Sequence, residues 1–193
     1  MLEQVLDRFP TRGVLRDGSP FSIRPPEAGD EVAFRDFHQV IPEREQLFVR
    51  SQIQDGSLFR ELTGDPSFED QLPLLAFIDG RMVALGLLRQ RIGGWKRHIG
   101  KVFFLTHPDY TGLGLIDQLL EQIIDSARHC GLTKLESELN GERETAIASM
   151  AAVGFRELVR LPGYIQDMQA EYHDYVVMGM ELIAPFEFLG AGD

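Results

Sequence analysis

Apolar residues recur every three or four positions in four stretches of the chain, which is the spacing of an amphipathic helix. We expect helices over residues 2–9, 30–41, 113–130 and 143–153. Pro10 and Pro42 follow the first two stretches, where a proline ends or bends a helix. Gly131 follows the third, at the position of a C-terminal cap. The first three helices therefore end at residues that stop helices.

Short apolar runs separated by glycine turns predict strands. Residues 13–25 form a hairpin pattern around Asp17-Gly18, and Pro20 predicts an edge position. We expect two strands within 72–92, one each over 98–106 and 134–140, and two more that flank 161–174. Residues 43–72 predict one or two short helices and a polar loop.

The order of these elements predicts a single α/β domain. A chain of 193 residues has ample length for one core and little room for two. We therefore expect one domain over residues 1–193, with an N-terminal helix in 1–12 and a tail at 184–193. The two phenylalanines of that tail predict either packing on the protein's own sheet or contact with a second copy in a homodimer.

The net charge of the chain indicates which classes of binding partner to expect. The chain carries 19 basic and 30 acidic residues, for a net charge of −11. Nucleic acids and anionic membranes reward clustered Lys and Arg, so we expect neither as a partner, whereas cationic substrates are compatible. The N-terminus lacks the charge pattern of a signal peptide, and no apolar run reaches membrane-spanning length, so we expect a cytoplasmic protein.

The cysteine and histidine content indicates neither a disulfide nor a metal site. Cys130 is the single cysteine, so an internal disulfide and a cysteine-based metal cage are excluded. The five histidines have no paired spacing typical of metal ligands, so we expect no metal site.

The stretch THPDYTGLGL, residues 106–115, carries the sharpest chemical signal. Gly112 and Gly114 join a predicted strand to a predicted helix, where helix amides and the macrodipole favour an anion. A Walker loop would need Lys followed by Ser or Thr after its second glycine, and a dinucleotide fingerprint would need glycine at Asp117. The loop therefore predicts a phosphate site of another kind.

The pattern P-x-Y-x-G-x-G between strand and helix, followed by a strand and a helix ending in Gly-Phe, resembles the GNAT superfamily of acetyl-CoA-dependent N-acetyltransferases. The resemblance is carried by VFFLTHPDYTGLGLIDQLLEQIIDSARHCGL (102–132), ERETAIASMAAVGF (142–155) and the ending LPGYIQDMQAEYHDYVVMGMEL. The opening LRDGSPFSIRP is similar to the acetyltransferase domain of bacterial protein-lysine acetyltransferases. The resemblance implies a central mixed, mostly antiparallel sheet with helices on both faces. It also implies a V-shaped splay for acyl-CoA between strands 98–106 and 134–139.

The resemblance also implies which residues bind the cofactor, acetyl-CoA. Those residues are Phe104, Leu105 and Thr106 along the pantetheine arm, Thr111, Gly112, Leu113, Gly114, Leu115 and Ile116 around the pyrophosphate, and Arg143 on the following helix. The family motif usually begins with Gln or Arg and ends with Gly or Ala, where this chain has Thr111 and Ile116. Thr111 therefore lacks a cationic phosphate contact, and Ile116 adds bulk near the ligand path.

Amine acylation needs a base for the amine proton and benefits from an acid for the leaving thiolate. By the resemblance, the base of protein-lysine acetyltransferases falls at Lys101 and a common tyrosine acid falls at Met150, so both positions are vacant.

Other side chains are candidates for these roles. Glu138, which matches an acidic position common in the lysine acetyltransferases, is the preferred base, against the reading of a solvated or salt-bridged strand carboxylate. Tyr164 and Tyr172 are candidates for the acid, against the reading of half-buried packing residues.

Two functions stay open. The first is an N-acetyltransferase that transfers an acetyl group from acetyl-CoA to a primary amine, either a small molecule or a protein lysine. The second is a GNAT-fold acyl-CoA-binding or regulatory module with little catalysis, which the residues at Thr111, Ile116, Lys101 and Met150 favour.

Overall fold

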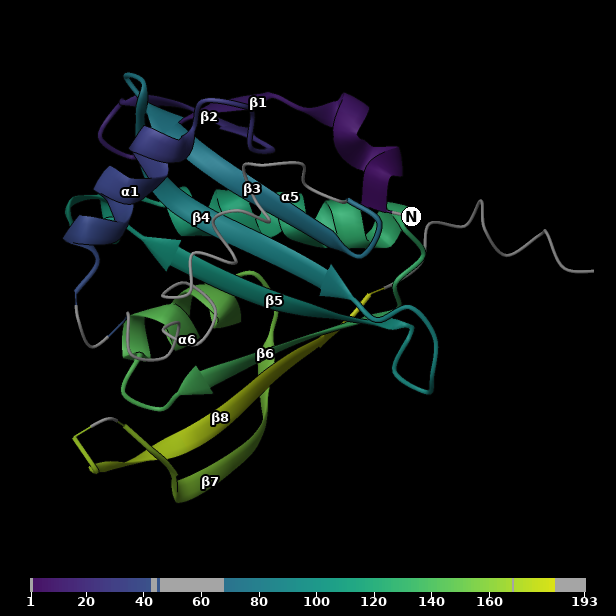
Figure 1. Ribbon diagram of the computed structural model, residues 1–193. Coiled ribbons are helices and arrows are strands. Elements are labelled where there is room, and N and C mark those ends of the chain that lie inside the picture. The colour runs from purple at the N-terminus through teal and green to yellow at the C-terminus, as the bar shows by residue number, and fades with distance from the viewer. Residues whose placement is uncertain (1, 43–44, 46–67, 168, 183–193) are drawn as a thin grey trace, which may run out of the picture.

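The computed structural model describes residues 2–42, 45, 68–167 and 169–182 (Figure 1). The expected tail at 184–193, and nearly all of the expected helices and loop in 43–72, lie outside these residues. The elements are η1 (Leu2–Arg8), β1 (Thr11–Val14), β2 (Pro20–Arg24), α1 (Glu31–Val40), β3 (Gln71–Ile78), β4 (Arg81–Gln90), β5 (Ile99–Thr106), η2 (Pro108–Tyr110), α5 (Leu115–His129), β6 (Lys134–Asn140), α6 (Glu144–Ala152), β7 (Arg156–Gln166) and β8 (Tyr172–Glu181).

The strands form one eight-stranded sheet in the order β1-β2-β3-β4-β5-β6-β8-β7. Neighbouring strands run antiparallel except β5 and β6, which are parallel. The parallel step is forced by α5, which crosses over between them as a βαβ connection. The predicted mixed, mostly antiparallel sheet is confirmed.

Helices cover both faces of this sheet (Figure 1). Leu115, Leu119 and Leu120 of α5 pack with Met150 of α6 in the larger apolar cluster, which also contains Leu2 of η1. Phe34, Phe37 and Ile41, from α1 and the residue after it, pack against the other face in a second cluster. Both faces of β3 and β4 are therefore covered, and their residues are buried almost without interruption.

Strands β5 and β6 separate after a short paired stretch (Figure 1). Ile99, Gly100 and Lys101 pair with Lys134, Leu135 and Glu136, and no further pair joins these two strands in the described part of the chain. The strands nevertheless continue to Thr106 and Asn140. The predicted splay is confirmed, and among the described residues the backbone of β5 beyond Lys101 has no strand partner on that side.

Two local expectations were wrong. Pro20 does not mark an edge strand, because β2 lies between β1 and β3; the sheet tolerates Pro20 since β2 pairs with β3 only over Ser22–Arg24. The last two strands extend to Gln166 and from Tyr172 instead of only flanking 161–174, since irregular register between Leu161 and Ile165 absorbs Pro162. The helix expected before Pro10 is present as the 3-10 helix η1.

None of the helices in the described part of the chain is long and apolar enough to cross a membrane.

Candidate functional site

The loop after β5 combines a proline-started turn with two left-handed glycines. Pro108 opens η2, and Gly112 and Gly114 have φ angles of 79° and 86°. Only glycine adopts such angles without strain, so the two glycines shape the entry into α5. The first backbone hydrogen bond of α5 is donated by the Gln118 N–H to the Gly114 carbonyl at 3.2 Å. The amides of the first turn therefore have no helical acceptor and are suited to an anion.

His107 holds this loop in place instead of reaching solvent or a phosphate. The side chain is buried, and its Nδ1 accepts the backbone N–H of Asp109 at 3.2 Å. Its Nε2 lies 2.9 Å from an Arg81 guanidinium nitrogen. Burial, followed by the nearby Arg81 charge, lowers the pKa of His107, so the ring is neutral at neutral pH. The ring therefore supports the loop from inside the fold.

A cavity of about 380 Å³ lies beside this loop. It is lined by Arg16, Pro42, Glu45, Phe104, Thr106, Pro108, Tyr110, Thr111, Gly112, Gly114, Ile116, Asp117, Arg143, Thr145, Ala146, Ala148, Ser149 and Ala152. Seven of the ten residues predicted for the cofactor are in this lining: Phe104, Thr106, Thr111, Gly112, Gly114, Ile116 and Arg143. The splay therefore adjoins a cavity that the predicted loop, β5 and α6 share.

The other three predicted cofactor residues do not line the cavity. Leu105 faces the opposite side of the sheet and packs in the α1 cluster. Leu115 is fully buried in the larger cluster, and Leu113 packs against it from outside. For Leu115 only the backbone is available to a ligand. Ile116 both lines the cavity and packs in the core, so its bulk has a structural use.

Arg143 lies in the cavity wall but is tied to neighbours. Its Nε is 2.6 Å from a Glu45 carboxylate oxygen, and its terminal nitrogen donates to the Phe104 carbonyl at 3.3 Å. The guanidinium also lies 5.6 Å from the centre of the Phe104 ring. Burial lowers the pKa of Arg143, and the Glu45 carboxylate opposes that shift. Arg143 thus holds one of the β5 carbonyls on the splayed side.

Helix α6 presents small side chains to the cavity. Thr145, Ala148, Ser149 and Ala152 line it at helical spacing. Met150, at the position where the family resemblance placed a tyrosine, is fully buried in the core and is not in the cavity lining. The hydroxyls that α6 offers here are those of Thr145 and Ser149.

Glu138 lies at the point where β5 and β6 separate. A carboxylate oxygen accepts a hydrogen bond from Lys101 Nζ at 2.5 Å, just beyond the last parallel pair. Burial raises the pKa of Glu138, but the bonds from Lys101 and Tyr175 lower it by more, so it ends below its usual value. Burial, followed by the Glu138 charge, raises the pKa of Tyr175 to about 12. A carboxylate, an ammonium and a phenol therefore meet at the opening of the splay.

The two predicted acid candidates lie on the last hairpin and are exposed. Tyr164 is 68% exposed and Tyr172 is 70% exposed. The Tyr164 ring centre lies 5.9 Å from that of Tyr175, so the structure brings Tyr164 near Glu138 through Tyr175. Tyr172 opens β8 opposite Gln166.

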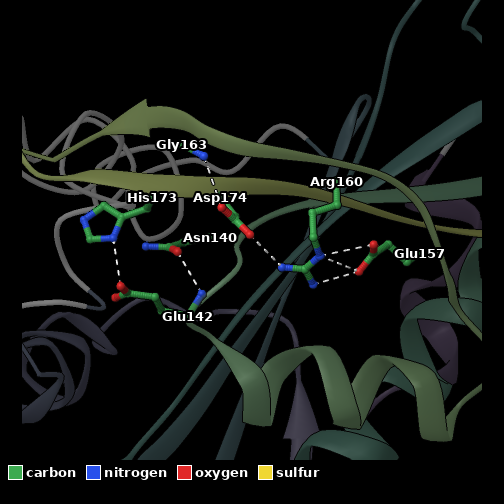
Figure 2. Close-up of polar contacts among 7 residues, drawn as sticks. All are labelled: Asn140, Glu142, Glu157, Arg160, Gly163, His173 and Asp174. Carbon is green, nitrogen blue, oxygen red and sulfur yellow. Dashed lines mark hydrogen bonds and ion pairs between the residues drawn. The ribbon is translucent and has the colours of Figure 1, made fainter.

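Polar contacts fasten the last hairpin to the turn after β6 (Figure 2). His173 Nδ1 lies 3.0 Å from a Glu142 oxygen, and its Nε2 lies 2.9 Å from an Asp167 oxygen. The ring can donate to both carboxylates only as an imidazolium. Accordingly the bonds to Asp167 and then Glu142 raise the pKa of His173.

A second group of ion pairs joins the two strands of the hairpin, β7 and β8 (Figure 2). Arg160 donates to Glu157 at 2.8 Å and to Asp174 at 3.3 Å. Asp174 also accepts the backbone N–H of Gly163 at 3.1 Å. Side chains of both hairpin strands thus stabilise the bend near Pro162.

Several residues that the sequence analysis did not assign to the site belong to it, among them Arg16, Glu45, Ser149 and Tyr175. Arg16 and Glu45 come from segments far from the loop in sequence, so no spacing rule could place them. The position of Tyr175 follows from the register of β6 and β8. Tyr175 pairs with Asn140, which lies two residues after Glu138 and therefore on the same face of the sheet.

Comparison with known proteins identifies the family. The model of the acetyltransferase (GNAT) family matches residues 35–155. None of the curated proteins matches the sequence.

Solved structures share the fold. The GNAT domain of S. lividans PAT has 22% identity and a TM-score of 0.72, covering 90% of this chain and 97% of that one. The ribosomal-protein-S18-alanine N-acetyltransferase of Escherichia coli has 22% identity and a TM-score of 0.62, covering 88% and 98%. The structure of yncA from Salmonella typhimurium with its cofactor acetyl-CoA has 18% identity and a TM-score of 0.63, covering 86% and 96%. These similarities establish the fold, and the family model spans more than half of the chain. The chain therefore belongs to the acetyltransferase (GNAT) family.

Proposed function

We propose that this protein transfers the acetyl group of acetyl-CoA to a primary amine, either a small molecule or a protein lysine. One observation carries the proposal: the cavity between the glycine loop, α6 and the unpaired edge of β5. A cofactor with a phosphate at one end and an extended amide arm needs both parts, namely free helix amides and a free strand edge.

The residues around the cavity fit acetyl-CoA. The amides after Gly112 can approach a pyrophosphate closely because Gly112 and Gly114 have no side chain. The small side chains of α6 leave room beside β5. Bound acetyl-CoA would supply an activated thioester, while the protein supplies position, a proton acceptor and hydrogen-bond donors.

Glu138 is the proposed proton acceptor. Its lowered pKa keeps it ionised at neutral pH, so it is always ready to accept, although its affinity for the proton is low. Tyr175, with a pKa of about 12, stays protonated and can donate a hydrogen bond at the same place. The net charge of −11 and the carboxylates on β6 favour a cationic amine as acceptor.

A second candidate function, an acyl-CoA-binding module with little catalysis, rests on the Lys101–Glu138 ion pair. A carboxylate held by an ammonium at 2.5 Å is a weaker base than a solitary one. Met150 adds to this alternative, because it places no hydroxyl in the cavity.

Purified protein with acetyl-CoA and a panel of amines, including lysine peptides, separates the two functions. Release of free CoA thiol that depends on the amine supports the transferase. Thermal stabilisation by CoA without turnover supports the module. If the protein shows neither turnover nor stabilisation by CoA, both functions are contradicted.

The Glu138→Gln variant tests the proposed base, with Glu136→Gln as the matched control. Both residues lie on the same face of β6, but Glu136 pairs with Lys96 at 3.6 Å. Loss of a general base lowers turnover by about 10²–10⁴-fold. We expect that loss in Glu138→Gln alone; equal activity of the two variants would remove Glu138 from the reaction.

A further inference from the structure

We propose that Arg16, from the β1–β2 hairpin, binds the CoA pyrophosphate and replaces the cation that the loop lacks at Thr111. The proposal rests on the proposed function, since it assigns a new residue to the same cofactor. It is carried by the position of Arg16, which lines the cavity from a part of the chain about a hundred residues before the loop.

Backbone and side-chain bonds attach Arg16 to the glycine loop. Its backbone N–H donates to the Leu113 carbonyl at 3.1 Å. Its guanidinium donates to the Gly112 carbonyl at 3.0 Å and to the Asp117 carboxylate at 3.3 Å. The hairpin is closed by the Leu15 N–H, which donates to Ser19 at 2.9 Å. The arginine is therefore held over the loop although its side chain is 69% exposed.

The guanidinium lies against the central glycine of the loop. A Cβ atom added to Gly114 would be 3.5 Å from Arg16 Nε and 3.8 Å from its Cζ. A guanidinium has five N–H donors in a planar fork, and the bonds to Gly112 and Asp117 occupy two of them. The remaining donors can reach an anion at the amides of the same loop, where phosphate contacts are strengthened by charge.

Asp117 gives Arg16 a second role in pyrophosphate binding. Its carboxylate is in the first turn of α5 and lines the cavity, so alone it would repel a pyrophosphate. The ion pair with Arg16 offsets that charge. Arg16 thus contributes a phosphate contact and also neutralises the acidic residue beside the phosphate site.

Calorimetry with CoA and dephospho-CoA tests the assignment on the full chain. Arg16→Ala should bind both ligands about tenfold more weakly than the native protein, the size of one exposed charge-assisted contact. Equal weakening is expected because both ligands carry the pyrophosphate. Arg12→Ala, which removes the same charge from the same hairpin outside this cavity, should bind both ligands as the native protein does.

Different results overturn different statements. Unchanged affinity in Arg16→Ala, or a loss equal to that of Arg12→Ala, overturns the role of Arg16 but leaves the proposed function standing. A loss seen with CoA but not with dephospho-CoA assigns Arg16 to the 3′-phosphate and overturns the pyrophosphate contact. Absence of CoA binding by the native protein overturns the proposed function, and this inference with it.

Two second-site variants test the two parts of the argument. Adding Asp117→Asn to Arg16→Ala should recover roughly threefold in affinity, because the unpaired carboxylate no longer repels the ligand. Adding Thr111→Arg instead should recover most of the loss, since it restores a cation at the usual motif position. No recovery with Thr111→Arg overturns the statement that Arg16 replaces that cation. Melting curves without ligand, unchanged in Arg16→Ala, would separate loss of binding from loss of fold.

Discussion

The strands on the two sides of the splay are stabilised in different ways. In β4 nearly every residue from Met82 to Leu88 is buried, because helices cover both faces. In β7 nearly every residue is exposed, and the strand is joined to its surroundings by pairing with β8 and by ion pairs of Arg160. The first side supplies the rigid edge along which a cofactor would lie, and the second presents polar side chains at the surface.

This difference has a consequence for function. A site built from backbone amides and core strands tolerates few changes, whereas exposed hairpin side chains change with little effect on stability. We therefore expect cofactor binding to depend on the glycine loop and acceptor choice to depend on the hairpin.

The largest effect should come from a core truncation in β4. Leu85→Ala leaves a cavity at a fully buried position and should lower the free energy of unfolding by about 2–5 kcal/mol. Val159→Ala, at a 40% exposed position of β7, should lower it by about 0.5 kcal/mol or less. Chemical denaturation measures both; similar losses would contradict the comparison.

The next effect concerns the loop. Gly114→Val forces a branched side chain to a φ of 86° and into the amide pocket, and we expect at least about a tenfold loss of CoA affinity. Gly131→Val, at a φ of 73° beyond the other end of α5, imposes similar backbone strain away from the cavity. Calorimetry should find CoA affinity reduced in Gly114→Val alone, and equal affinities would remove the loop from the site.

A smaller effect should depend on pH and on the hairpin. His173 has a raised pKa in the folded state, so its stabilisation is complete below its unfolded pKa of about 6.5 and is lost as pH rises through the folded value. The melting temperature of His173→Gln should fall below that of the native protein more at pH 5.5 than at pH 8.5. A difference that does not vary with pH would mean that the ring is not charged in the fold.

The smallest effect should be a shift in a pH profile. Lys101→Met removes a bond and a charge that lower the pKa of Glu138, so that pKa should rise. If Glu138 is the base, the acidic limb of kcat/KM moves to higher pH, since the carboxyl must ionise first. An acidic limb that stays in place would contradict the assignment of Glu138, whatever happens to the maximal rate.

The sequence by itself determined the elements and the loop. Helical periodicity predicted α5 within two residues of its start at Leu115, and the two glycines predicted a turn whose φ angles are positive. The pattern also predicted the splay between β5 and β6 through its likeness to a family. The helix and the glycine turn depend on residues that are near one another in the chain, so a local pattern is enough to predict them, whereas the splay was implied only by the resemblance.

The tertiary structure alone decided which side chains meet at the site. Arg16 reaches the glycine loop across about a hundred residues, and Lys101 meets Glu138 only because β5 and β6 pair for three residues and then separate. Met150 is in the core because α6 turns that side toward α5 and presents Ser149 to the cavity. Sheet register and helix rotation set such contacts, and both depend on how the entire core packs, which no short stretch of sequence encodes.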